Sequence, residues 1–306
     1  MRIGEELREE TQRFNDQLRR KLAGLASPET VPVAATRQAR YDGTGIFPAP
    51  EFDPDARWED ANGIRVRVLD AAEPRGVYLH IHGGGWTLGA ADLQDRLLTW
   101  LVRETGLTVV SVDYRLAPEH PHPAAIDDCV TAARWLLDGG VTAPRRFAIG
   151  GESAGAHLAV ATLQRLGAGH GFAGANLLYG GFDLGGTPSR RRWNDTLVMS
   201  DPFMAWATEN FTPGLDDEQR RTPEISPLYG DLDGMPPAHF IVGSADPLLD
   251  DTLFMAARWE AAGNECELLV YEDGAHAFNA FPTALAQLAN DAQAAFLSRV
   301  GAGEAA

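Results

Sequence analysis

Short apolar runs alternate with helix-length segments along most of this chain. Six runs are apolar enough to be strands buried on both faces, at 76–81, 107–112, 145–150, 174–179, 238–243 and 266–271. Segments with helical periodicity lie at 92–104, 123–138, 154–167, 249–262 and 282–299. Apolar strands joined by helices are typical of a parallel sheet covered on both faces. An Asn62-Gly63 turn between two further strand-like segments predicts a hairpin. The pattern therefore predicts an α/β fold.

Two regions interrupt this alternation. The N-terminal segment places Leu7, Phe14 and Leu18 at helical spacing between charges, which predicts an amphipathic helix packed on the protein body. Acidic residues on its polar face argue against membrane attachment. The prolines and glycines of 28–54 predict an irregular connector. Residues 183–237 show no good strand pattern, and so long a loop is rare in a compact domain, so we expect an insertion with short helices.

The charge balance and the cysteines limit the possible partners. The chain has 43 Asp and Glu against 26 Lys and Arg, a formal net charge of −17, which disfavours a nucleic-acid partner. There is no apolar run long enough for a membrane span, and the charged N-terminal segment lacks the apolar core of a signal peptide. Cys129 and Cys266 lack metal-ligand spacing and are interpreted as free thiols. We therefore expect a cytoplasmic protein.

The sharpest motif is Gly151-Glu152-Ser153-Ala154-Gly155, which follows a strand-like run and precedes a helix-like one. A serine hydroxyl becomes an effective nucleophile when a strained turn holds it beside a base and oxyanion donors. The flanking glycines allow such a turn. The pattern G-x-S-x-G is weak alone, but its strand–turn–helix context disfavours a simple glycine-rich turn. Ser153 is therefore the candidate nucleophile.

A run of glycines, His82-Gly83-Gly84-Gly85-Trp86, follows the strand predicted at 76–81. Its unshielded backbone N–H groups suit an oxyanion hole, to which we expect Gly83, Gly84 and Ala154 to contribute. A phosphate-binding loop is the alternative. It is disfavoured because neither common glycine-rich phosphate motif is present and no lysine lies nearby.

A serine nucleophile needs a base, and the base needs an acid that orients it. His276 lies in a glycine-containing loop after the last apolar run, and Asp246 follows the run at 238–243. Both positions fall after parallel strands, at the sheet edge where α/β folds place their sites. The chain order Ser153, Asp246, His276 is the order found in α/β-hydrolases.

Alternatives exist for the acid and for the histidines. Asp250 and Asp251 begin a helix, where carboxylates favour the helix dipole and cap the first turn, so capping is the expected role. Asp273 precedes the base too closely to orient its ring. His80 and His82 have a spacing that some metal ligands share, but no further ligand cluster completes a site, so we expect no metal.

Five motifs in this order resemble the hormone-sensitive-lipase-like (bacterial family IV) carboxylesterases of the α/β-hydrolase superfamily. The motifs are His82-Gly83-Gly84-Gly85, Asp113-Tyr114-Arg115-Leu116-Ala117-Pro118-Glu119-His120-Pro121, Gly151-Glu152-Ser153-Ala154-Gly155, Asp246-Pro247-Leu248 and His276-Ala277-Phe278. The chain departs from the usual family pattern at Glu152, Trp86 and Ala277, and no departure removes a reacting group.

The resemblance implies an eight-stranded, mostly parallel sheet flanked by helices, with its second strand antiparallel and a helical cap over the site. It implies a single domain over 1–306, with a catalytic core at 51–184 and 226–306 and a cap from 1–50 and 185–225. It also implies structural polar contacts of Asp113, Arg115 and Glu119 behind the oxyanion loop. Relatives in this family often dimerise, so a homodimer is a further expectation.

The activity that the resemblance implies is hydrolysis of small or short-chain carboxylic esters through an acyl-enzyme, without a cofactor. Aromatic side chains are candidates for the wall of the substrate pocket, with core packing as the alternative for each: Trp86, Phe203, Trp206 and Phe278, with Phe14 and Phe211 in the cap. The same triad serves amidases, carbamate hydrolases and natural-product deacylases, which stay open as alternatives. A non-catalytic small-molecule receptor on this fold is disfavoured because all three triad residues are present.

Overall fold

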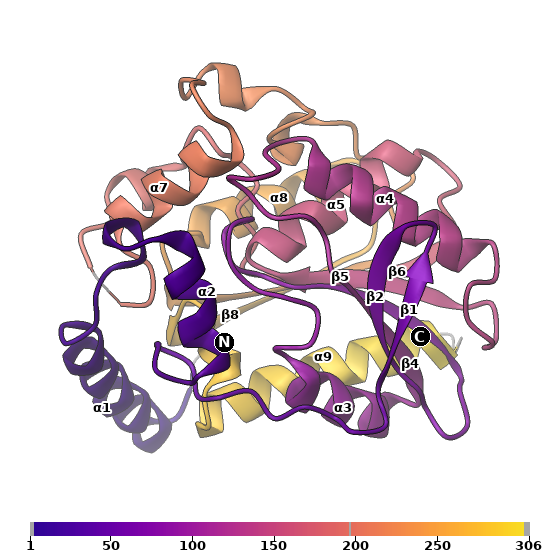
Figure 1. Cartoon of the computed structure of the whole chain (residues 1–306), viewed down its shortest axis with the longest axis horizontal. Helices are drawn as coiled ribbons and strands as arrows, with labels where there is room; N and C mark the ends of the chain where they lie inside the picture. The colour runs from indigo at the N-terminus through magenta and orange to yellow at the C-terminus, as the bar shows by residue number, and fades with distance from the viewer. Residues whose placement is uncertain (1–2, 196, 303–306) are drawn as a thin grey trace.

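An eight-stranded sheet forms the centre of the structure (Figure 1), a computed structural model that describes residues 3–195 and 197–302. Its strands in spatial order are β1 (Arg57–Ala61), β2 (Ile64–Leu69), β4 (Leu107–Val112), β3 (Gly76–Ile81), β5 (Phe147–Glu152), β6 (Phe172–Leu178), β7 (Ala238–Ala245) and β8 (Cys266–Ala275). β2 is antiparallel to both of its neighbours, and the pairs from β4 to β8 are parallel. The α/β fold and the antiparallel second strand are confirmed.

Two helical layers cover the sheet, as Figure 1 shows, because its central strands are apolar on both faces. On β3, Val77 and Leu79 belong to the core cluster that contains residues of α4, α5 and α8, whereas Tyr78 packs with residues of α3 and α9. The helix bounds are α3 (Asp95–Thr105), α4 (Ala124–Leu137), α5 (Ala154–Leu166), α8 (Leu249–Ala261) and α9 (Ala284–Ala302). Among the described helices, none is both long and apolar enough to cross a membrane.

The N-terminal region corrects one expectation. The amphipathic helix is present as α1 (Glu5–Leu22), but 28–54 is not an irregular connector throughout, because it contains η1 (Pro28–Thr30) and α2 (Val33–Tyr41). Pro32 stands at the N-cap of α2, and Gly43, with φ +64°, follows its C-cap. Proline just before a helix and glycine just after it are normal boundary signals, so these residues delimit α2 rather than exclude it.

The insertion between β6 and β7 consists of short helices, as expected from its lack of a strand pattern. These are α6 (Pro188–Arg191), α7 (Asp201–Phe211), η2 (Gln219–Arg221) and η3 (Pro227–Tyr229). A further short helix outside the insertion, η4 (Phe278–Ala280), follows β8. α7 lies beside the N-terminal helices on the left of Figure 1, and it contacts η1. Two segments far apart in the sequence are thus brought together beyond the sheet.

Candidate active site

Ser153 occupies the turn between β5 and α5, with φ 55° and ψ −118°. A non-glycine residue in this backbone region is strained, and such strain is common where a nucleophile is presented at a strand–helix elbow. The turn also requires close packing on β3. A Cβ atom on Gly155 would lie 1.9 Å from the carbonyl oxygen of Ile81, so only glycine fits there. The elbow therefore exposes the Ser153 side chain at the carboxyl end of the sheet.

His276 and Asp246 form a hydrogen-bonded chain that ends on Ser153. His276 follows the last residue of β8, and its Nε2 lies 3.0 Å from Ser153 Oγ. On the other side of the ring, Nδ1 donates to Asp246 Oδ2 at 2.9 Å. Asp246 is inaccessible to solvent, and its Oδ1 accepts the backbone N–H of Leu248 at 2.8 Å. The carboxylate therefore fixes a tautomer in which Nε2 can accept the serine proton.

The alternative acids lie away from this chain. Asp250 accepts the backbone N–H of Ser189 at 2.7 Å, and Asp251 accepts those of Phe182 and Asp183 at 2.7 and 2.8 Å. Both lie in the first turn of α8, as expected, but neither caps it, because the N-cap is Leu248, with no side-chain hydrogen bond. Both carboxylates instead hold the segment after β6 against α8.

Asp273 also points away from the base, towards the N-terminal helix. It accepts a hydrogen bond from Gln12 Nε2 at 2.8 Å and forms an ion pair with Arg8 at 3.3 Å. The carboxylate therefore links β8 to α1 and does not contact His276.

The glycine loop after β3 presents backbone donors beside the nucleophile. Gly84 has φ +127°, and a Cβ atom there would lie 2.1 Å from the carbonyl oxygen of Leu88, so the turn requires glycine. A Cβ atom on Gly83 would lie 3.4 Å from the Cβ of Ser153, which places this backbone against the elbow. Within the described residues, no acceptor takes the N–H of Gly83, Gly84 or Ala154. These groups are free to bind an oxyanion.

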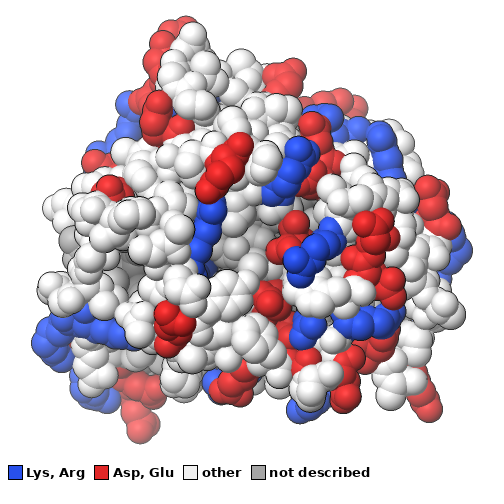
Figure 2. Space-filling view, viewed as in Figure 1, with Lys and Arg blue, Asp and Glu red and all other residues white. Residues whose placement is uncertain are grey.

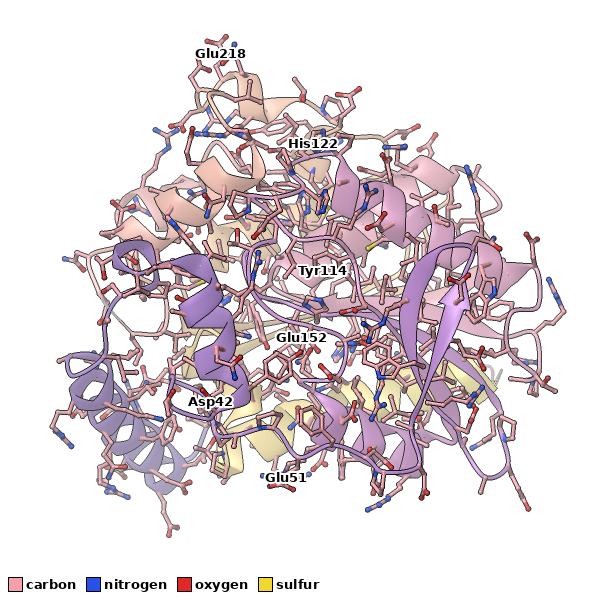
Figure 3. The ribbon with its side chains drawn as sticks, viewed as in Figure 1. Asp42, Glu51, Tyr114, His122, Glu152 and Glu218 are labelled. Carbon is pink, nitrogen blue, oxygen red and sulfur yellow. The ribbon has the colours of Figure 1, made fainter. Side chains whose placement is uncertain are left out.

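Buried polar contacts hold the glycine loop and the elbow in place. Tyr114 donates its hydroxyl to the carbonyl oxygen of His82 at 2.9 Å and stacks on its ring with centroids 4.2 Å apart. His80 joins Glu152 at 3.0 Å and Ser111 at 3.0 Å. Tyr114 and Glu152 lie near the centre of the molecule in Figure 3. Glu152, one of the departures from the family pattern, thus bonds to β3 beneath the loop.

A family model described as the alpha/beta hydrolase fold matches residues 78–280. The fold resembles an esterase from the bacterial hormone-sensitive lipase family, with a TM-score of 0.79 and 30% identity over 98% of this chain and 99% of that one. The chain belongs to the hormone-sensitive-lipase-like carboxylesterases. An esterase of Acinetobacter venetianus is 36% identical over 241 residues, which are 76% of this chain and 78% of that protein. Carboxylesterase NlhH of Mycobacterium tuberculosis is 37% identical over 242 residues, 72% of this chain and 74% of that protein.

Two less similar relatives of this carboxylesterase have names that specify an ester. One is an ethyl acetate hydrolase of Pseudomonas putida, 31% identical over 233 residues that make up 72% of each chain. The other is an acetyl esterase of Salmonella choleraesuis, 32% identical over 214 residues, 65% of this chain and 64% of that protein. The family assignment makes this chain a carboxylic ester hydrolase.

The polar residues expected behind the oxyanion loop of the carboxylesterase do form structural contacts. Asp113 accepts the backbone N–H of Ala91 at 3.4 Å, and Arg115 pairs with Asp128 at 2.7 Å. Glu119 instead contacts the N-terminal segment, because it accepts hydrogen bonds from the guanidinium of Arg37 in α2. Two of these contacts stay within the core, and the third reaches the N-terminal segment.

The structural role of Arg37 in α2 was not predicted from the sequence. Its guanidinium donates to Glu119 at 2.8 and 2.9 Å and to the backbone oxygens of Thr87 and Ala117, both at 2.9 Å. Thr87 belongs to the turn that follows the glycine run. One arginine therefore fixes α2 to the loop that carries the oxyanion donors.

A cavity of about 1730 Å³ opens over Ser153 and His276 in the carboxylesterase. Its walls come from α2, α3, α7, α9 and the glycine loop. Figure 2 shows this face hollowed near its centre, with basic and acidic side chains beside the opening. Most of the lining is apolar, which suits the hydrocarbon part of an ester substrate.

Two of the four aromatic residues expected in the pocket wall do line the cavity, namely Trp86 and Phe203. The other two do not. Phe278 is buried against Tyr271, with ring centroids 5.3 Å apart, and belongs to the core below the site. Trp206 is three residues beyond Phe203 on α7 and packs on it from outside the lining.

Phe14 and Phe211 pack on other aromatic side chains and do not line the cavity, in agreement with the alternative of core packing given above. Phe14 packs on Phe281, and Phe211 stacks on Trp86 with centroids 4.7 Å apart. The indole of Trp86 also donates to His157 Nδ1 at 3.1 Å, so the ring is held at the wall. The cavity aromatics that the sequence did not indicate are Phe47, Phe52, Trp100, Tyr179 and Phe281.

Tyr179 is the missed residue closest to the proposed chemistry. Its ring packs edge-on against the His276 imidazole, with centroids 4.9 Å apart, and its hydroxyl donates to Asn279. It is the first residue after β6, with φ 38°. A polar aromatic residue at the carboxyl end of a central strand was the signal that could have indicated it.

Two buried histidines near the site are held neutral by their surroundings. Burial lowers the pKa of His157 to about 4, and its Nε2 donates to the carbonyl oxygen of Ile225 at 2.8 Å. Burial also lowers the pKa of His82 to about 3. In the part of the chain that the structure describes, there is no cluster of three or more His, Cys, Asp or Glu that could hold a metal ion.

Proposed function

We propose that this carboxylesterase hydrolyses short-chain carboxylic esters through an acyl-enzyme formed on Ser153, with His276 as the base and Asp246 as the orienting acid. The observation that carries the proposal is the pair of hydrogen bonds made by His276, at 3.0 Å to Ser153 Oγ and 2.9 Å to Asp246 Oδ2. Both lie within the range expected of a nucleophile, its base and the orienter of that base.

In the first step, Ser153 Oγ attacks the ester carbonyl and His276 Nε2 takes its proton. The carbonyl oxygen becomes an alkoxide, which the N–H groups of Gly83, Gly84 and Ala154 stabilise. Asp246 stabilises the imidazolium that forms. Collapse of the tetrahedral intermediate breaks the bond to the alcohol, which leaves with the proton held by His276.

In the second step, water replaces the alcohol. His276 removes a proton from the water as its oxygen attacks the acyl-enzyme, and the same N–H groups hold the second oxyanion. Collapse returns the proton to Ser153 and releases the carboxylic acid. The two half-reactions use the same residues, so each triad substitution should affect both.

We propose that 1–50 and 185–225 form a cap that limits the length of the substrate, because α2 and α7 both contribute to the cavity wall. Two relatives have names that refer to ethyl acetate and to acetyl esters, and we extend that substrate class to this chain.

The test uses a series of 4-nitrophenyl esters from acetate to laurate, with 4-nitroacetanilide as the matched amide. We expect kcat/KM to be highest for the shortest chains and the anilide to be cleaved far more slowly. A fluorophosphonate should label Ser153 and leave Ser153→Ala unlabelled. Equal turnover of acetate and laurate, faster cleavage of the anilide, or labelling that persists in Ser153→Ala would overturn the proposal.

A homodimer and a cytoplasmic location remain proposals that follow from the family resemblance and from the composition. Sedimentation equilibrium of the full chain would measure its oligomeric state. Fractionation of the host cell would measure its location.

A further inference from the structure

Arg40 is a cation in the wall of the catalytic cavity. It lies on α2, one turn after Arg37, and it lines the same space as Ser153 and His276. Its guanidinium carbon is 4.9 Å from the centre of the Phe47 ring. The side chain is therefore held across an aromatic face, with its charge beside the substrate space.

The guanidinium of Arg40 has no acceptor in the described part of the chain, because it forms neither an ion pair nor a hydrogen bond there. Other arginines of the cavity wall differ. Arg190 donates to Thr208 Oγ1 at 3.0 Å, Arg96 pairs with Glu51 at 3.3 Å, and Arg103 is exposed to solvent. Arg40 thus combines partial burial with five unused donors.

The groups that face Arg40 do not supply a negative charge. Tyr114 and His82 are its titratable neighbours. Burial raises the pKa of Tyr114 well above its ordinary value and lowers that of His82 to about 3, so both are neutral at pH 7. Burial also lowers the pKa of Arg40 to about 10, which still leaves it charged at pH 7. A cation without a negatively charged partner therefore remains in the wall of the cavity that Ser153 also lines.

Such a cation is partly shielded from water, and an anion that enters the cavity can pair with it. Removing a guanidinium from water without a partner costs free energy, and a ligand that supplies the partner recovers it. The planar fork of an arginine matches the two oxygens of a carboxylate. A single guanidinium balances one negative charge, which favours a carboxylate over a phosphate dianion.

We propose that Arg40 binds a carboxylate on the substrate, so that the preferred substrates are small esters that carry one carboxylate away from the scissile bond. The inference rests on the proposed esterase function and specifies its substrate class. The net charge of −17 repels such substrates, but at physiological salt the repulsion from charges more than about 8 Å away is largely screened. A cation inside the cavity acts at closer range than that.

The test compares two matched pairs of esters. On the acyl side, mono-4-nitrophenyl adipate is compared with 4-nitrophenyl hexanoate. On the alcohol side, 4-acetoxybenzoate is compared with 4-acetoxybenzamide. The carboxylate replaces a methyl group in the first pair and a carboxamide in the second. The ratio of kcat/KM values within a pair therefore measures how well the enzyme recognises the carboxylate. The pair that responds shows which end of the substrate reaches Arg40.

We expect Arg40→Gln to lower the ratio of anionic to neutral substrate in one pair by about 10- to 100-fold, the loss expected for a charged hydrogen-bonded pair. The change should lie mainly in KM, and the neutral ester should keep its kcat/KM within about threefold. Arg40→Lys should retain part of the ratio, because it keeps the charge but not the fork. Arg13→Gln removes the same charge from an exposed site on α1 and should leave both ratios unchanged.

The proposal is overturned if Arg40→Gln leaves both ratios at the wild-type values, or if it slows anionic and neutral esters equally. The melting temperature of Arg40→Gln should stay within a few degrees of the wild type, since the variant loses the contact with Phe47 and also the partly buried charge. A lower melting temperature together with equal losses would indicate a structural role instead.

A binding measurement separates this proposal from the esterase proposal. Calorimetry of Ser153→Ala should detect mono-4-nitrophenyl adipate or 4-acetoxybenzoate, and the double variant with Arg40→Gln should bind it at least about tenfold more weakly. Equal binding by both would overturn the role of Arg40 even if esters are hydrolysed. If the double variant binds these carboxylates more weakly than Ser153→Ala, but the wild-type chain cleaves no ester, only the esterase function would be overturned.

Discussion

Replacing Asp246 by asparagine should remove most of the activity of this carboxylesterase while preserving its fold. Asp246 accepts from His276 Nδ1 at 2.9 Å and from the backbone N–H of Leu248 at 2.8 Å. An asparagine amide has one acceptor and one donor end. Whichever way it is turned, an NH₂ group meets either the imidazole or the backbone donor. The neutral amide also cannot stabilise an imidazolium.

The expected loss follows from the geometry. Two unit charges 2.9 Å apart, the separation of Asp246 Oδ2 and His276 Nδ1, attract by about 6 kcal/mol at an effective dielectric constant of about 20. Since the imidazolium forms only during the reaction, this energy stabilises the transition state and not the substrate complex. About 6 kcal/mol corresponds to a fall in kcat of about 10⁴-fold, which is also the size seen when other triads lose their acid.

The assay is the steady-state hydrolysis of 4-nitrophenyl acetate, with kcat and KM measured separately. We expect kcat to fall by about 10⁴-fold and KM to change little, because the interaction is made only in the transition state. Asp250→Asn is the matched control, since Asp250 lies four residues further along and its carboxylate accepts the backbone N–H of Ser189, in the segment after β6. Its kcat should stay within about tenfold of wild type.

Two results would refute this reasoning. One is a kcat for Asp246→Asn within tenfold of the wild type with the melting temperature unchanged. The other is a larger fall in Asp250→Asn than in Asp246→Asn, which would mean that the acid has been misassigned.

Three other substitutions test the supports of the site. Arg37→Met should lower the free energy of unfolding in urea by about 1–3 kcal/mol, because it removes charged hydrogen bonds to Glu119 and two backbone oxygens; no change would mean that α2 is held by other contacts. Gly155→Ala should cost more than about 3 kcal/mol or prevent folding, since its Cβ would overlap a backbone oxygen of β3, whereas Gly4→Ala, with open space around it at the N-cap of α1, should cost less than about 1 kcal/mol. For His157, the native pKa of about 4 lies below the unfolded value of 6.5, so the unfolded chain binds the extra proton first as the pH falls. Stability should therefore drop between pH 6.5 and pH 4 by about 3 kcal/mol from this residue, and His157→Gln should show a shallower slope; an equal slope would exclude the residue as the cause.

Most of the sheet could be predicted because its signals are local. The runs at 76–81 and 107–112 coincide with β3 and β4, since a fully buried parallel strand must be apolar at every position. β8 runs to Ala275, four residues beyond the predicted 271, through polar residues that periodicity treats as loop. Pairing with β7 holds this extension, and pairing between distant strands is not encoded in the composition of one segment.

The candidate site was predictable where a local motif fixes the backbone and unpredictable where distant segments meet. The structure places Ser153, Asp246 and His276 within hydrogen-bonding distance, and their catalytic roles stay predictions. The pocket wall depends on which side of α7 turns inwards. Phe203 lines the cavity, whereas Trp206, three residues later on α7, contacts Phe203 but does not line the cavity. The helical period of the sequence does not tell which of these two aromatic residues faces the cavity.

The hydrogen bonds of Arg37 make the N-terminal segment a poor module for exchange between relatives. A chimera that receives a foreign N-terminus would lose the arginine that braces the turn after the glycine run, even though no reacting residue had been replaced. Grafts intended to alter substrate range should therefore transfer the arginine and its glutamate partner together, or the geometry of the oxyanion donors will change along with the entrance.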